Sequence, residues 1–99
     1  MESTLDSLNA ILTYIEFFKS SMTDCELLTA IQDQMDKHGI SKKFINNVYG
    51  ISIMNYHNLS PVTSACIKLY RIITELESKC NTDHINLNTL TIFKLTNPI

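Results

Sequence analysis

The residues of this chain that are best suited to chemistry lie between positions 38 and 50, in the stretch HGISKKFINNVYG. Gly39 can end one helix, because glycine takes the left-handed conformation of a helix C-terminus without strain. A second helix is predicted from 41 to 50, with apolar residues on one side. The other side gathers hydroxyl, ammonium and amide groups, from Ser41, Lys42, Lys43, Asn46 and Asn47. That face can attract anions and form hydrogen bonds.

The net charge of −2 hides an uneven distribution along the chain. Residues 1–36 contain seven acidic residues and one lysine, which gives −6, whereas residues 75–99 sum to −1. Residues 37–74 contain no acidic residue and have a charge of +5, from Lys37, Lys42, Lys43, Lys68 and Arg71. A local positive field can attract a polyanion even when the whole chain is negative. The alternative is that few charges of either sign fall in this segment.

No residue set for catalysis or metal binding can be assigned from the sequence. The histidines His38, His57 and His84 are isolated and lack a partner at the spacing of metal ligands. There is no glycine-rich phosphate loop, and no nucleophile and base can be paired without inventing their contacts. We therefore expect a non-enzyme that uses no cofactor or metal.

The cysteines and the N-terminal segment bear on the cellular location. Cys25, Cys66 and Cys80 are odd in number and lack C-x-x-C spacing, so we expect three reduced thiols. The N-terminus lacks the pattern of a secretory signal, and no apolar run is long enough to span a membrane. The prediction is a cytoplasmic protein without a membrane segment.

Periodicity and capping residues predict four helices, at 1–20, 23–38, 41–50 and 61–80. Thr23 and Glu26 have the spacing of a capping box, in which each side chain accepts a hydrogen bond from a backbone N–H at the helix start. Ser60 followed by Pro61 marks the start of the last helix, since proline at the first helical position loses no hydrogen bond. An apolar stripe then continues to Cys80.

The tail from 84 to 96 is rich in Thr and Asn, and its apolar positions change phase midway. We expect it to be extended, as a strand, with a small hairpin or a short last helix as the alternatives. No repeat or linker divides the chain, so residues 1–99 are predicted to form a single all-α domain, a compact bundle of four to five helices with a short β tail as an option. The predicted core is Leu8, Leu12, Ile15, Leu28, Ile31, Ile45, Val48, Cys66, Leu69, Ile73 and Leu76.

Extended back to position 31, the stretch reads IQDQMDKHGISKKFINNVYG. It resembles the helix-turn-helix of bacterial and phage repressors of the LacI and lambda-repressor-like families. Those families have a glycine at the turn, then an aliphatic residue and often a serine, and two further aliphatic residues six and nine positions after the glycine. The corresponding residues here are Gly39, Ile40, Ser41, Ile45 and Val48. The first helix departs from the pattern, because Met35 stands where a small residue is usual and His38 where an apolar one is.

The resemblance implies a DNA-binding transcriptional regulator whose recognition helix is 41–50. In such domains this helix enters the major groove, where lysine meets guanine or phosphate and asparagine pairs with adenine. The implied DNA-binding residues are Ser41, Lys42, Lys43, Asn46 and Asn47, with Lys68 and Arg71 nearby. Repressor domains usually read two half-sites, so a homodimer is expected, through the fourth helix or through strand pairing of residues 85–95.

The alternative is a small helical module that binds another protein and no DNA. The apolar stripe of residues 62–80 favours this interpretation, as does an aromatic patch if Tyr14, Phe17 and Tyr70 are exposed together. The two hypotheses differ on one structural point. DNA binding requires Lys42, Lys43, Asn46 and Asn47 to form an exposed ridge with Lys68 or Arg71 close by.

Overall fold

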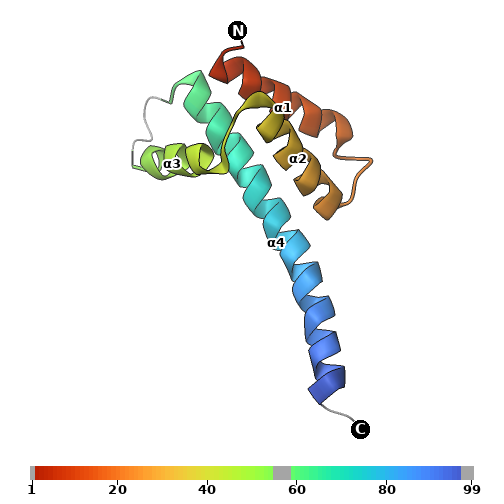
Figure 1. The fold of residues 1–99 in the computed structure, drawn as a ribbon. Helices are drawn as coiled ribbons and strands as arrows, with labels where there is room; N and C mark the ends of the chain where they lie inside the picture. The colour runs from red at the N-terminus through yellow and green to blue at the C-terminus, as the bar shows by residue number, and fades with distance from the viewer. Residues whose placement is uncertain (1, 55–58, 97–99) are drawn as a thin grey trace.

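The computed structural model describes residues 2–54 and 59–96, and the side chains among them as far as residue 80. The described residues form four helices and no strand. They are α1 (Thr4–Phe18), α2 (Asp24–His38), α3 (Lys42–Ser52) and α4 (Pro61–Thr96). Figure 1 shows α4 as the long axis of the molecule, with the three shorter helices gathered around its first half. The fold is therefore all-α, as the sequence predicts.

Local signals account for where the helices begin and end. The Thr23 side chain accepts a hydrogen bond from the Glu26 N–H, and the Glu26 carboxylate accepts one from the Thr23 N–H, which completes the capping box. Hydrogen bonding of the Glu26 carboxylate to the backbone N–H of Thr23, and then to its side chain, holds the pKa of the Glu26 carboxyl below its usual value. Gly39 ends α2 with a φ of 71°, in the left-handed region that glycine enters without strain. Ser41 caps α3, since its side chain accepts from the Phe44 N–H.

The fourth helix is longer than the sequence predicts. It begins at Pro61 as expected, but it runs to Thr96, whereas the prediction ended the helix at residue 80 and made 84–96 an extended tail. The extended tail is therefore wrong, and residues 84–96 continue the helix. The physical reason is that no glycine or proline interrupts the sequence between Val62 and Thr96. The asparagines and threonines that suggested a break are weak helix formers, but they do not stop a helix.

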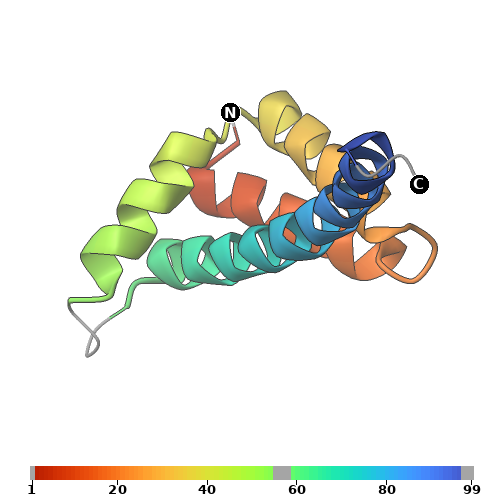
Figure 2. The ribbon, with the colours of Figure 1, turned by 90° about the horizontal axis from the view of Figure 1, so that it is seen from below.

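The core lies where α1, α2 and α3 each pack against α4 (Figures 1 and 2). Eight of the predicted core residues are buried: Leu8, Ile15, Ile31, Ile45, Cys66, Leu69, Ile73 and Leu76. The other three, Leu12, Leu28 and Val48, are partly buried at its edge. The prediction omitted five buried residues: Ile11, Leu27, Met35, Ile40 and Ala65. Adjacent pairs such as Ile11 and Leu12 point about 100° apart on a helix, so only one of them reaches the centre.

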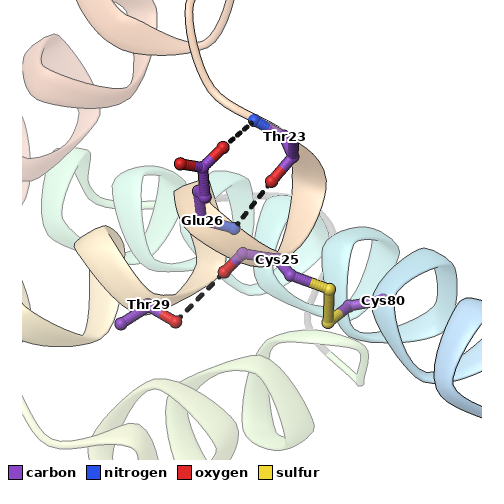
Figure 3. Close-up of a disulfide and its surroundings, with 5 residues drawn as sticks. All are labelled: Thr23, Cys25, Glu26, Thr29 and Cys80. Carbon is purple, nitrogen blue, oxygen red and sulfur yellow. Dashed lines mark hydrogen bonds between the residues drawn. A yellow bond between two sulfur atoms is a disulfide. The ribbon is translucent and has the colours of Figure 1, made fainter.

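A disulfide joins Cys25, near the start of α2, to Cys80 on α4 (Figure 3). Their Cα atoms are 5.1 Å apart, within the usual range for a disulfide. The expectation of three reduced thiols is therefore wrong, because α2 and α4 pack side by side and bring together cysteines 55 positions apart. The inference from reduced thiols to a cytoplasmic location no longer applies, and that location stays a prediction.

Cys66 is the free cysteine, and it is fully buried in the core. Burial raises the pKa of the Cys66 thiol, which disfavours the reactive thiolate. Cys66 therefore packs as a small apolar side chain, and its presence explains why the cysteine count is odd although two of the three are paired.

The disulfide should contribute strongly to stability. Closing a loop of 55 residues removes unfolded-state entropy worth about 4 kcal/mol. Reductant should therefore lower the urea midpoint of the wild-type chain, and it should leave the midpoint of the double variant Cys25→Ser/Cys80→Ser unchanged. Thiol titration of the denatured, unreduced chain should find one free thiol, that of Cys66. Three free thiols in that titration would show that the disulfide does not form.

Candidate functional site

The polar residues predicted as a DNA-binding set start at the beginning of α3. Ser41 has a structural role, because its hydroxyl accepts the Phe44 N–H at 3.0 Å and caps the helix. Lys43, Asn46 and Asn47 are exposed and stand away from the buried Ile45. Their spacing of three and four residues places them on one outward face. These three of the four predicted ridge residues therefore form an exposed ridge on α3.

Lys42 does not belong to that ridge. Its ammonium group pairs with the Glu77 carboxylate on α4, so it faces the neighbouring helix rather than solvent alone. Residues 37–74 contain no acidic residue, but the fold places Glu77, from outside that segment, against Lys42. The pair neutralises one of the five positive charges on which the predicted field depends.

A second contact fixes how α3 lies on α4. The ring of Tyr49 stacks on that of Tyr70, with centroids 3.7 Å apart and planes 12° apart. Lys42 and Tyr49 are seven positions apart on α3, and their partners Glu77 and Tyr70 are seven positions apart on α4 in the opposite order. The two helices therefore run in opposite senses where they meet, and Figures 1 and 2 show α3 crossing the first part of α4 at a wide angle.

Helix α3 packs chiefly on α4 and makes few contacts with α2. In a helix-turn-helix the two helices lie against each other across a short turn. Here Gly39 makes the turn, as the sequence predicts, and Ile40 beside it is buried, but α2 and α3 are held together mainly through α4. Figure 2 shows α3 on the far side of α4 from the turn between α1 and α2.

The two basic residues predicted to lie near the ridge, Lys68 and Arg71, are on α4, and each borders a hollow. Lys68 borders a hollow beside α1, where Glu16 is also present. Arg71 borders a hollow with Tyr49 and Ser52, near the C-terminal end of α3. The seven predicted residues thus fall into a cap, an ion pair, an outward ridge and a pair of cations on α4, and the structure does not gather them into one site.

A groove between the C-terminal half of α3 and the outer face of α4 is the main concave feature of this region. One part has a volume of about 210 Å³ and is lined by Tyr49, Ser52, Ile53, Leu59, Ile67 and Arg71. A second part, of about 330 Å³, shares Leu59, Ile67 and Arg71 and continues along α4 past Ser64 and Lys68 to Glu75. Because the two parts share three residues, we describe them together as the α3–α4 groove.

Exposed apolar side chains cluster at the same end of α3. Among the described residues, six large apolar side chains are exposed, and five of them lie between positions 44 and 59. Ile53 and Leu59 line the groove and are 52% and 39% exposed. Ile51 and Met54, at 70% and 88%, are exposed beside them at the end of α3. A globular domain rarely concentrates apolar surface in this way unless the surface binds something.

The predicted aromatic patch of Tyr14, Phe17 and Tyr70 is divided between two places. Tyr14 and Phe17 both contact Phe18 near the end of α1, with ring centroids 4.6 Å and 5.3 Å from it. Tyr70 instead stacks on Tyr49 beside the groove. Sequence reasoning missed Tyr49, Ile53, Leu59 and Ile67 as groove residues. The isoleucine and leucine spacing gave no signal for them, because a groove depends on how two helices meet.

The histidines do not form a metal-binding group among the described residues. The His38 ring nitrogen lies 2.9 Å from a Glu2 carboxylate oxygen, and this hydrogen bond lowers the pKa of Glu2. His57 and the side chain of His84 lie outside the described residues. Within the described part of the chain there is no group of three or more His, Cys, Asp or Glu residues able to hold a metal ion.

Among the described residues, no helix combines the length and the apolar character that crossing a membrane requires. No protein-family model matches the chain, and no curated protein or solved structure is significantly similar to it. The geometry of the groove and the ridge is therefore the basis on which a function can be proposed.

Proposed function

We propose that this chain is a non-catalytic protein-interaction module that binds a partner protein in the α3–α4 groove. The observation that carries the proposal is the concentration of exposed apolar side chains at 51–59 around a concave surface. Tyr49 and Arg71 line this surface, and Tyr70 stacks on Tyr49. Tyrosine and arginine are the residue types, with tryptophan, that most often dominate binding energy at protein interfaces.

Selection from a displayed peptide library tests this function even though the partner is unidentified. Peptides enriched on the wild-type chain should bind at least tenfold more weakly to Ile67→Glu, because that variant places a charge on the groove floor. They should bind Phe17→Glu as well as wild type, since Phe17 is 80% exposed on α1 and does not line the groove.

Both variants must first show wild-type helicity and cooperative unfolding. The proposal fails if no peptide is enriched on the wild-type chain. It also fails if the enriched peptides lose binding to Phe17→Glu and keep it on Ile67→Glu, since the aromatic end of α1 would then be the binding surface.

DNA binding is a second candidate, and the exposed ridge of Lys43, Asn46 and Asn47 favours it. Two observations weigh against it: Lys42 is paired with Glu77, and α3 packs on α4 rather than on α2. One free lysine on the ridge would give few phosphate contacts and therefore weak binding at physiological salt. A homodimer through α4 stays a prediction, while pairing of residues 85–95 as strands conflicts with the helix there.

Anisotropy titrations with mixed duplex DNA at low salt test the second candidate. If the ridge binds DNA, Lys43→Ala should weaken binding to all duplexes and reduce the salt slope by about one contact. Asn47→Ala should cost about 1–3 kcal/mol on the preferred sequence alone. Lys19→Ala, just after the end of α1, is the control and should bind as wild type does. Absence of binding by a folded sample at micromolar concentration would exclude DNA as the ligand.

A further inference from the structure

The α3–α4 groove is lined by two cations, Lys68 and Arg71, and by one acid, Glu75. Arg71 and Lys68 both line it, and neither has an ion-pair partner among the described residues. Glu75 is the acidic residue at the end of the groove, and its carboxylate lies 3.4 Å from the Lys79 ammonium group. The groove therefore combines an apolar floor with an excess of positive charge at its rim.

The shape of the groove limits what can fill it. Along α4 it extends from Ser64 to Glu75, which at 1.5 Å per residue is roughly 16 Å, or about three helical turns. Helix α4 and Leu59 line this length, and the end of α3 closes one end of it. The exposed residues Ile53 and Leu59 and the half-buried Ile67 give it an apolar floor. An amphipathic helix placed in a hydrophobic groove buries residues at i, i+3, i+4 and i+7, which matches a groove of this length.

We propose that the α3–α4 groove binds an amphipathic helix of a partner protein that carries carboxylates beside its apolar face. The apolar face of this helix covers Ile53, Leu59 and Ile67, and its carboxylates meet Arg71 and Lys68. The planar guanidinium of Arg71 can hold a carboxylate through two parallel hydrogen bonds, which gives the contact direction as well as charge. This inference rests on the proposed function, and it adds the chemical class of the partner.

The apolar floor and the charged rim of the groove have different roles in binding. Burial of apolar surface supplies most of the affinity, because exposed ion pairs in water contribute little each. The cations at the rim select the sign of the partner's charge and its orientation. Replacing carboxylates by ammonium groups on the bound helix turns attraction into repulsion at both Arg71 and Lys68. The charge of the ligand should therefore change its affinity clearly even though each pair is weak.

A matched pair of designed peptides tests the proposal. Both have the same helical register and leucines at i, i+3, i+4 and i+7, and they differ only in carrying glutamate or lysine beside that face. Each is titrated at low salt into the full-length, ¹⁵N-labelled chain and followed by amide chemical shifts. The acidic peptide should bind about tenfold or more tightly than the basic one, with shifts concentrated at residues 49–53 and 59–72.

Arg71→Glu should reverse the preference between the two peptides. Lys19→Glu makes the same change in net charge just after the end of α1, outside the groove, and should leave the preference as in wild type. Equal binding of both peptides at the groove would overturn the acidic helix while leaving the interaction module standing. Binding of neither peptide would also overturn it, and selection from the peptide library then decides separately whether the groove binds peptides at all. Groove shifts that appear on concentrating the chain alone would overturn it in favour of a second copy.

Discussion

The apolar stripe on the first half of α4 is the constraint on which the rest of the structure depends. Ala65, Cys66, Leu69, Ile73 and Leu76 recur at steps of three and four residues and are all buried. Each of the other three helices buries its own apolar side against α4. One stripe therefore organises the whole bundle, and the disulfide from Cys25 to Cys80 fixes α2 to α4 just beyond its end.

The same constraint leaves a surface uncovered. The buried stripe occupies only one side of α4. Residues on the other side, such as Ile67 and Arg71, point away from the core. Helix α3 covers only the flank of α4, where Tyr49 stacks on Tyr70. It ends at Ser52, and α4 begins at Pro61, so the apolar residues Ile53 and Leu59 remain at the edge of the contact. The groove is a consequence of a short helix lying beside a long one.

Sequence reasoning reached the features that depend on near neighbours in the chain. The capping box of Thr23 and Glu26, the left-handed Gly39 and the start at Pro61 could all be predicted, because each is set within a few residues. Most of the core followed from helical periodicity. Where two apolar residues are adjacent, as at Leu27 and Leu28, periodicity could not choose between them, because the choice depends on the angle at which the helix packs.

Features that depend on distant residues could not be predicted. The pairing of Cys25 with Cys80 and of Lys42 with Glu77 joins positions 55 and 35 apart, and no local pattern specifies either contact. These contacts change the functional interpretation, because Lys42 is no longer a free cation on the ridge. The groove was missed for the same reason: its floor comes from residues on both sides of the connection between α3 and α4.

The groove exists because α3 packs on α4, with the ring of Tyr49 against that of Tyr70. Nuclear Overhauser contacts in solution measure this arrangement directly, since the rings of Tyr49 and Tyr70 are 3.7 Å apart between centroids. We predict strong contacts between these two rings, together with contacts between the methyl groups of Leu59 and Ile67, which line the same hollow. Contacts from Tyr49 to residues of α2 in place of Tyr70 would contradict the account, because α3 would then pack on α2 and the groove would not exist.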